Sequence, residues 1–108
     1  MNDNFIELDE ANFHQEVLSA LQPVLVEFWA GWSESCKAMA PVLESVAKDD
    51  VVPVKIARVN VERHENLTDQ YGVRAVPTLL LFNQGALQDQ IVGRITEQAV
   101  RESLERLT

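Results

Sequence analysis

The spacing of apolar residues near the N-terminus predicts a strand followed by a helix. Residues 5–8 have the apolar-rich alternation of a short strand. After Asn12, a residue suited to begin a helix, apolar side chains recur every fourth position, as on one face of a helix. These side chains belong to Phe13, Val17 and Leu21. We therefore expect a first β-α step whose helix buries this face.

The segment 24–30 predicts a strand in the middle of a parallel sheet. It is apolar or aromatic at every position except Glu27, a pattern typical of a strand that is covered on both faces. Ser33 or Ser35 is suited to cap the helix that follows, and that helix has an apolar stripe. The stripe consists of Cys36, Met39, Ala40, Leu43, Val46 and Ala47. Cys36 is therefore expected on the buried face of the helix.

The middle of the chain predicts a third strand and a short helix. Residues 51–61 are rich in apolar and β-branched side chains, as strands are. Residues 65–71 predict a short helix that ends at Gly72, because glycine suits the left-handed backbone conformation that follows many helices.

The rest of the sequence predicts a hairpin and a terminal helix. Residues 78–82 and 90–93 are typical of strands, and the polar turn 83–85 between them predicts antiparallel pairing. Thr96 is suited to cap a last helix, whose apolar stripe is Val100, Leu104 and Leu107. The order β-α-β-α-β-α-β-β-α predicts one α/β domain over residues 1–108, with a central mixed β-sheet and helices on both faces.

Length and charge limit the classes of function. The 108 residues are enough to bury roughly two-thirds of the surface that the unfolded chain exposes. The formal net charge of -8 disfavours nucleic acid and anionic membrane surfaces as partners. The N-terminus lacks the basic and apolar pattern of a signal peptide, and no apolar run approaches the roughly 20 residues of a membrane span. We expect a cytoplasmic monomer.

The two histidines do not indicate a metal site. His14 and His64 lie far apart in the sequence on predicted polar surface, without Cys or acidic residues at ligand spacing. We therefore expect solvated histidines, no metal and no cofactor.

Several segments together resemble the thioredoxin family, and the resemblance covers essentially the whole chain. They are Val24–Ala30, Cys36–Lys37, Ala40–Pro41, Tyr71–Thr78 and Val92–Gly93. The most specific are the aromatic-rich strand before the active-site turn, the helix proline Pro41, and residues 76–78, which in the family hold a cis-proline beside the active site. The resemblance implies the thioredoxin fold.

The departures from the family fall at its active site. Thioredoxins have Cys-Gly-Pro-Cys after the tryptophan, whereas this chain has Ser33-Glu34-Ser35-Cys36 and a single cysteine in total. The resemblance thus places Ser33 at the attacking cysteine and Cys36 at the resolving one. A disulfide cycle needs two sulfur atoms that can bond, and a serine hydroxyl does not ionise near neutral pH. We predict that the dithiol disulfide reductase cycle does not run.

Two interpretations of Cys36 are open. In the favoured one it is a small apolar core residue, because burial and the negative charge of nearby Glu34 both disfavour the thiolate. In the other, the helix dipole favours the thiolate, and Cys36 works singly through a mixed disulfide with glutathione or a partner thiol.

Two interpretations of Glu27 are also open. Glu27 occupies the position of the family's buried acid, which assists proton transfer at the resolving cysteine, and burial raises the pKa of a carboxyl as that role requires. Arg58 occupies the position of the family's neighbouring lysine, so the alternative is a structural Glu27–Arg58 ion pair. We favour the ion pair, because the exchange reaction that the acid would serve has lost its first step.

The resemblance also implies a shallow apolar groove for extended polypeptide. Its residues here are Trp32, Val61, Ala75, Val76, Pro77 and Gly93. All remain apolar or small, and backbone groups beside a cis-proline can pair with an extended peptide. The alternative is that these residues only maintain the fold, which we expect to apply fully to Val61 and in part to Pro77. We therefore expect a chaperone-like module that binds a polypeptide client or partner protein.

Two other functions are weighed against this one. The first is a single-thiol protein disulfide oxidoreductase that works through Cys36 in cell redox homeostasis. The second is a subunit or assembly factor of a larger complex, whose acidic surface selects a basic partner.

Overall fold

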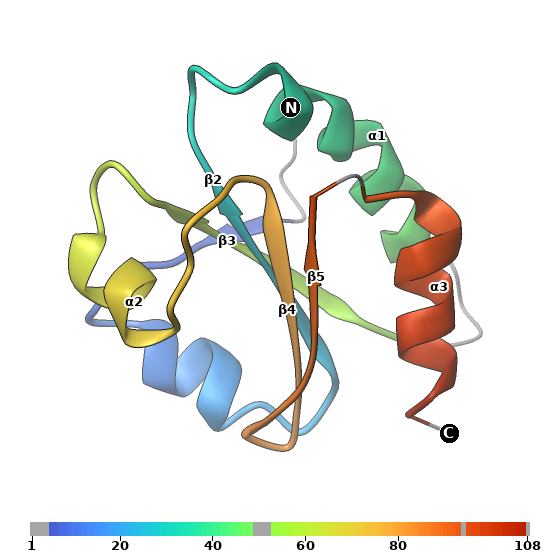
Figure 1. Ribbon diagram of the computed structural model, residues 1–108. Helices are drawn as coiled ribbons and strands as arrows, with labels where there is room; N and C mark the ends of the chain where they lie inside the picture. The colour runs from blue at the N-terminus through green and yellow to red at the C-terminus, as the bar shows by residue number, and fades with distance from the viewer. Residues whose placement is uncertain (1–4, 49–52, 94, 108) are drawn as a thin grey trace.

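A five-stranded mixed sheet forms the centre of the molecule. The computed structural model describes residues 5–48, 53–93 and 95–107. The strands are β1 (Phe5–Glu7), β2 (Val24–Trp29), β3 (Lys55–Asn60), β4 (Thr78–Asn83) and β5 (Ala86–Val92), and they lie in the order β1-β3-β2-β4-β5 (Figure 1). β1, β3 and β2 are parallel, whereas β4 and β5 are antiparallel to their neighbours. The predicted central position of the apolar strand β2 is confirmed.

Helices cover both faces of the sheet, as predicted. On one face lie α1 (Glu34–Ala47) and α3 (Glu97–Glu105), and on the other lie α2 (Glu65–Gln70) and the π-helix η1 (His14–Leu18) (Figure 1). Alternate residues of β2 point to the two faces: Val26 packs with the η1 and α2 side, and Leu25 packs with the α1 and α3 side. Among the described residues, no helix is long and apolar enough to cross a membrane.

The first helix is shorter than predicted. Phe13 and Val17 are buried as expected, but η1 ends at Leu18, and Leu21 is 88% exposed in the loop before β2. The N–H of Ser19 donates to the carbonyl of His14, which closes the helix after a single turn. The expectation that Leu21 continues the buried face is therefore wrong.

The third strand is also shorter than predicted. Residues 51–52 lie outside the described residues, and residues 53–54 are described but are not part of a strand. β3 begins at Lys55, opposite Val24, and ends at Asn60, opposite Trp29, so it extends only as far as its partner β2. At this end of the strand, the Lys55 N–H donates to the carbonyl of Pro23. The strand stops where pairing stops.

The hairpin and the last helix follow the sequence pattern. Gln84 (φ 51°) and Gly85 (φ 82°) form the left-handed turn between β4 and β5. β5 is longer than the predicted 90–93, because it pairs with β4 from Ala86 onward. The predicted cap Thr96 is confirmed, since its side chain accepts a hydrogen bond from the Ala99 N–H.

Candidate functional site

The site begins where β2 ends and α1 starts. Ser33 is the N-cap of α1, and its Oγ accepts a hydrogen bond from the Cys36 N–H over 3.2 Å. The Ser33 carbonyl accepts a further bond from the Lys37 N–H. Ser33 is 6% exposed, whereas Ser35 is exposed, so the structure selects Ser33 as the cap. The Ser33 hydroxyl oxygen thus serves to begin the helix.

Cys36 lies on the buried face of α1. It is a free cysteine and is 3% exposed, which confirms the expected burial. It lines a hollow of about 370 Å³, which we call the Cys36 hollow. The other lining residues are Trp29, Ala30, Gly31, Lys37, Ala40 and Arg58. Lys37 and Arg58 therefore line the same hollow as the one thiol of the chain.

Glu27 is a buried carboxylate in the middle of β2. It is 2% exposed and lies opposite Arg58 in the parallel register of β2 and β3. Arg58 Nε donates to Glu27 Oε1 over 3.0 Å, and Arg58 Nη1 lies 3.5 Å from Glu7 Oε2 on β1. The ion pair that the sequence suggested is present, and it belongs to a row of charges across neighbouring strands.

The electrostatics of Glu27 reflect competition between burial and Arg58. Burial raises the pKa of Glu27 above its ordinary value, and the nearby guanidinium opposes this shift without cancelling it. Glu27 Oε2 is buried and has no hydrogen-bond partner among the described residues. Arg58 is held in turn by Trp29, whose ring centroid lies 4.3 Å from the guanidinium carbon. Whether Glu27 transfers protons stays a prediction.

A cis peptide bond between Val76 and Pro77 shapes the opposite wall of the site. Because Phe28 of β2 pairs with Thr78 of β4, the turn after β2 and the loop before β4 meet at the same end of the sheet. Thr78 also pairs with Val92 of β5, which brings the segment after β5 to this end as well. Loops that are far apart in the sequence therefore converge beside the N-terminus of α1.

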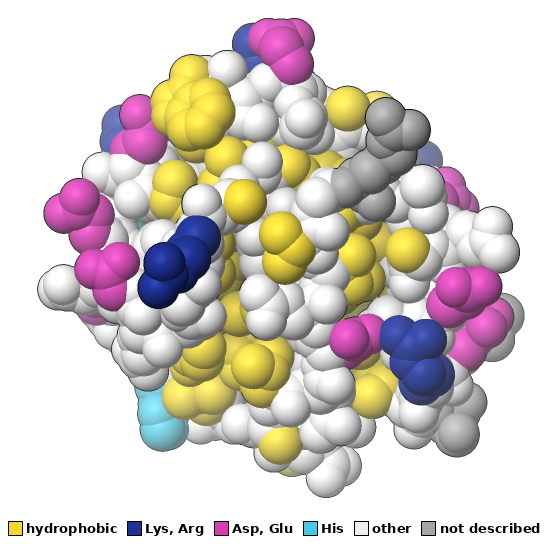
Figure 2. All heavy atoms as spheres, in the orientation of Figure 1, with side chains coloured by type: hydrophobic (Ala, Val, Ile, Leu, Met, Phe, Trp, Pro, Cys, Tyr) yellow, Lys and Arg dark blue, Asp and Glu magenta, His cyan; other side chains and the backbone are white. Residues whose placement is uncertain are grey.

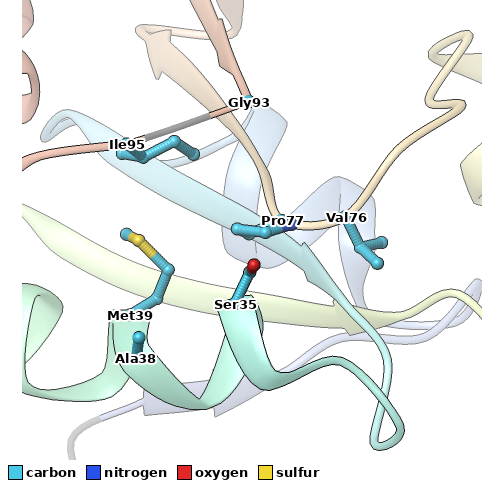
Figure 3. Close-up of a pocket in the computed structure, with 7 residues that line it drawn as sticks. All are labelled: Ser35, Ala38, Met39, Val76, Pro77, Gly93 and Ile95. Carbon is cyan, nitrogen blue, oxygen red and sulfur yellow. The ribbon is translucent and has the colours of Figure 1, made fainter.

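Two adjoining hollows lie between these loops. The α1 hollow, of about 370 Å³, is lined by Ser35, Ala38, Met39, Val76, Pro77, Gly93 and Ile95. Figure 3 shows the Ser35 hydroxyl directed toward Pro77 and the Met39 side chain directed toward Ile95. The Trp32 hollow, of about 160 Å³, is lined by Trp32, Val61, Thr68, Val73, Arg74, Ala75 and Val76. Together they form what we call the groove, and Val76 belongs to both.

The groove contains every residue that the sequence assigned to it. Trp32, Val61 and Ala75 line the Trp32 hollow, Pro77 and Gly93 line the α1 hollow, and Val76 lines both. Cys36 lines neither of them. The structure therefore brings the predicted binding residues together and places the thiol in a different hollow.

The surface of the groove is apolar and partly open. Trp32 is 67% exposed, Ala75 is exposed and Val76 is partly exposed. The backbone N–H and C=O of Val76 make no hydrogen bond with another described residue. Figure 2 shows hydrophobic side chains gathered over the centre of the viewed face, with most acidic side chains at its periphery. Such a surface suits an extended peptide.

Sequence reasoning missed several residues of the groove. Met39 and Ile95 were assigned to the core or to no role, yet both line the α1 hollow. Arg74 lines the Trp32 hollow and was not singled out. Its position in the sequence, two residues before the predicted groove residue Val76, was the signal that could have placed it in the groove. Its exposure, and the absence of a side-chain partner for it among the described residues, become visible only in the structure.

The histidines lie outside this site. His64 Nδ1 lies 2.9 Å from Glu10 Oε1, so His64 contacts an acidic residue that the sequence spacing did not indicate. Within the part of the chain that the structure describes, no group of three or more His, Cys, Asp or Glu side chains is arranged to hold a metal ion.

Comparison with known proteins identifies extensive similarity. Residues 4–106 match the Thioredoxin family. The chain is 36% identical over 105 residues to the protein named Thioredoxin of Pseudomonas aeruginosa, covering 97% of each chain. It is 37% identical over 97 residues to Thioredoxin 1 of Synechococcus elongatus, covering 90% of this chain and 91% of that one. Thioredoxin 1 of Nostoc sp. is 35% identical over 100 residues, covering 93% and 94%.

Proposed function

We propose that this chain, which belongs to the thioredoxin family, binds an extended segment of a client or partner polypeptide in the groove without exchanging disulfides. The observation that carries the proposal is an open apolar groove beside a single buried thiol that does not line it. We further propose that it does so as a chaperone-like monomer in the cytoplasm.

The chemistry of the site supports binding rather than exchange. An exchange cycle within one chain needs a second sulfur, and the sequence contains one cysteine. Ser33, at the position that the family resemblance assigns to the attacking cysteine, is buried and caps α1. Its hydroxyl does not ionise near neutral pH and therefore lacks the nucleophilicity of a thiolate.

The groove offers two kinds of contact to an extended segment. The Val76 N–H and C=O, which no other described residue engages, can pair with the backbone of a client as an added strand does. Apolar side chains of the client can then enter the α1 hollow and the Trp32 hollow, which lie on either side of Val76. Backbone pairing would give affinity with little sequence preference, and the hollows would add preference for apolar side chains.

The Cys36 hollow favours a second candidate function. Cys36 lines this hollow, so a small disulfide that entered the hollow would lie beside the one thiol of the chain. In this alternative the Cys36 thiolate attacks the disulfide of oxidised glutathione, forms a mixed disulfide and releases one molecule of glutathione thiolate. The low exposure of Cys36, which lies on the buried face of α1, makes this the weaker candidate.

Turnover of a protein disulfide substrate with dithiothreitol distinguishes the two functions. The native chain is compared with Ser33→Cys, which restores the second sulfur, and with Cys36→Ala. We expect the native chain to be no faster than dithiothreitol alone and Ser33→Cys to gain activity. Turnover by the native chain that Cys36→Ala abolishes would establish the single-thiol enzyme and overturn the proposal.

A further inference from the structure

We propose that the groove selects polypeptide segments in which a single carboxylate lies near an apolar residue, and that Arg74 receives this carboxylate. The inference rests on the proposed function and names the class of client. It assigns the apolar residue to the Trp32 hollow and the carboxylate to the rim of that hollow.

Arg74 is a cation at the edge of an apolar hollow. It is exposed and lines the Trp32 hollow together with Trp32 and Val76. No ion pair or hydrogen bond joins its side chain to another described residue. All of its guanidinium donors are therefore available to a ligand, including the pair that can bind a carboxylate in bidentate fashion.

The cations that line the neighbouring Cys36 hollow are already paired. Lys37 lies 3.0 Å from Glu34, and Arg58 bonds Glu27. In a chain with 17 acidic and 9 basic residues, partners for a cation are abundant, yet Arg74 has none among the described residues. Unlike Lys37 and Arg58, Arg74 has no carboxylate partner among the described residues, so its guanidinium can pair with a carboxylate of a bound molecule.

The rest of the surface limits how acidic the client can be. Most acidic side chains lie around the periphery of the face that Figure 2 shows, and the net charge is -8. Salt screens charges that lie beyond about 8 Å under physiological conditions, so Arg74 dominates only for a carboxylate that contacts it. A run of acidic residues would extend to the acidic periphery and be repelled. The geometry thus favours one carboxylate.

The spacing in the client follows from strand geometry. In an extended segment that pairs with Val76, alternate side chains point to the same side, and residues i and i+2 are separated by about 7 Å. Arg74 and Val76 line the same hollow. A carboxylate two residues from the apolar side chain in the Trp32 hollow therefore lies on the side of the segment that faces Arg74.

Peptide titrations test this inference. Fluorescently labelled peptides share an extended sequence with a central Leu and differ only two residues away, where they carry Asp, Asn or Lys. Each is titrated against the native chain, Arg74→Gln and Arg63→Gln. Arg63 is a matched control, because it is exposed, has no ion pair with a described residue and lines neither hollow of the groove.

We expect the Asp peptide to bind the native chain about threefold more tightly than the Asn peptide, the size of an exposed ion pair. Arg74→Gln should remove this difference, Arg63→Gln should keep it, and about 1 M salt should suppress it. Equal binding of the Asp and Asn peptides, or tightest binding of the Lys peptide, would overturn the inference and leave the proposed function standing. Failure of all peptides to bind would overturn both.

Discussion

The Oγ atom of Ser33 accepts a hydrogen bond from the backbone N–H of Cys36 over 3.2 Å. This bond joins the two ends of the segment from Ser33 to Cys36, where α1 begins. It satisfies one of the N–H groups that a helix leaves unpaired at its start. Ser33 thus has a structural function as the cap of α1, and its side chain is almost fully buried.

Replacing Ser33 with Ala should lower the free energy of unfolding by about 1 kcal/mol, because the cap bond is lost and the Cys36 N–H remains buried. Urea denaturation monitored by circular dichroism measures the change. Ser35→Ala is the matched control, since Ser35 is exposed in the first turn of the same helix. Equal losses in the two variants would contradict the assignment of Ser33 as the cap.

The sequence could not distinguish these two serines. Both precede the apolar stripe of α1, and both have the side-chain oxygen that a cap requires. The distinction depends on the backbone, which is extended at Ser33 (φ -90°, ψ 118°) and helical from Glu34 onward.

Glu27 should make stability depend on pH. Because burial raises its pKa in the folded state, the folded chain binds more protons than the unfolded chain between the ordinary pKa of 4.5 and the raised value. The free energy of unfolding contributed by this group therefore falls as pH rises through that window. Urea denaturation at a series of pH values upward from 4.5 should show this fall in the native chain and lose it in Glu27→Gln.

The comparison of the two pH profiles is the measurement, rather than stability at any one pH. Glu27→Gln also removes the partner of Arg58, which lowers stability at every pH and shifts the whole curve. Parallel curves for the native chain and Glu27→Gln would show that the carboxyl does not titrate differently in the folded state.

The thiol of Cys36 should react slowly in the native protein, because it is 3% exposed. Modification by a disulfide reagent such as 5,5′-dithiobis(2-nitrobenzoate) should be at least tenfold slower without denaturant than in urea, as expected when reaction requires local opening. The control is Ser35→Cys in a Cys36→Ala background, which places a thiol on the exposed side of the same turn. Native Cys36 reacting as fast as this control would favour the single-thiol alternative.

The hairpin turn should depend on Gly85. A Cβ atom built there would lie 2.8 Å from the Leu18 carbonyl oxygen, and the backbone is left-handed (φ 82°). Gly85→Ala should therefore cost more than the roughly 1–2 kcal/mol of a left-handed alanine. Gly72→Ala is the control, because Gly72 is also left-handed but has open space around its Cβ position. Similar losses in thermal or urea denaturation would show that the contact with Leu18 relaxes.

The order of elements was predictable because most of the apolar residues that form the core recur at regular spacings along the sequence. The apolar segment of β2 and the stripe of α1 pack as their spacings indicate. Leu21 continues the four-residue spacing of the buried face, but the helix ends at Leu18, so the spacing predicts a burial that does not occur. The start of β5 could not be predicted from alternating apolar and polar residues, because this edge strand is largely exposed from Ala86 onward.

The candidate site was predictable only as far as the family resemblance reached. Trp32, Val76 and Pro77 were placed in the groove by their similarity to family positions, and the structure brings them together there. Met39 lines the groove through a tertiary arrangement that no local pattern encodes, whereas the sequence position of Arg74, two residues before Val76, was a signal for its place there. The separation of Cys36 from the groove likewise depends on which side of α1 each residue faces.

Val76 forms a wall of both the α1 hollow and the Trp32 hollow. A change in the volume of the Val76 side chain alters both hollows at once. The effects on binding free energy of one mutation in each hollow should therefore be additive only in chains that keep Val76. A substitution at this one position thereby changes the shape of both hollows of the groove.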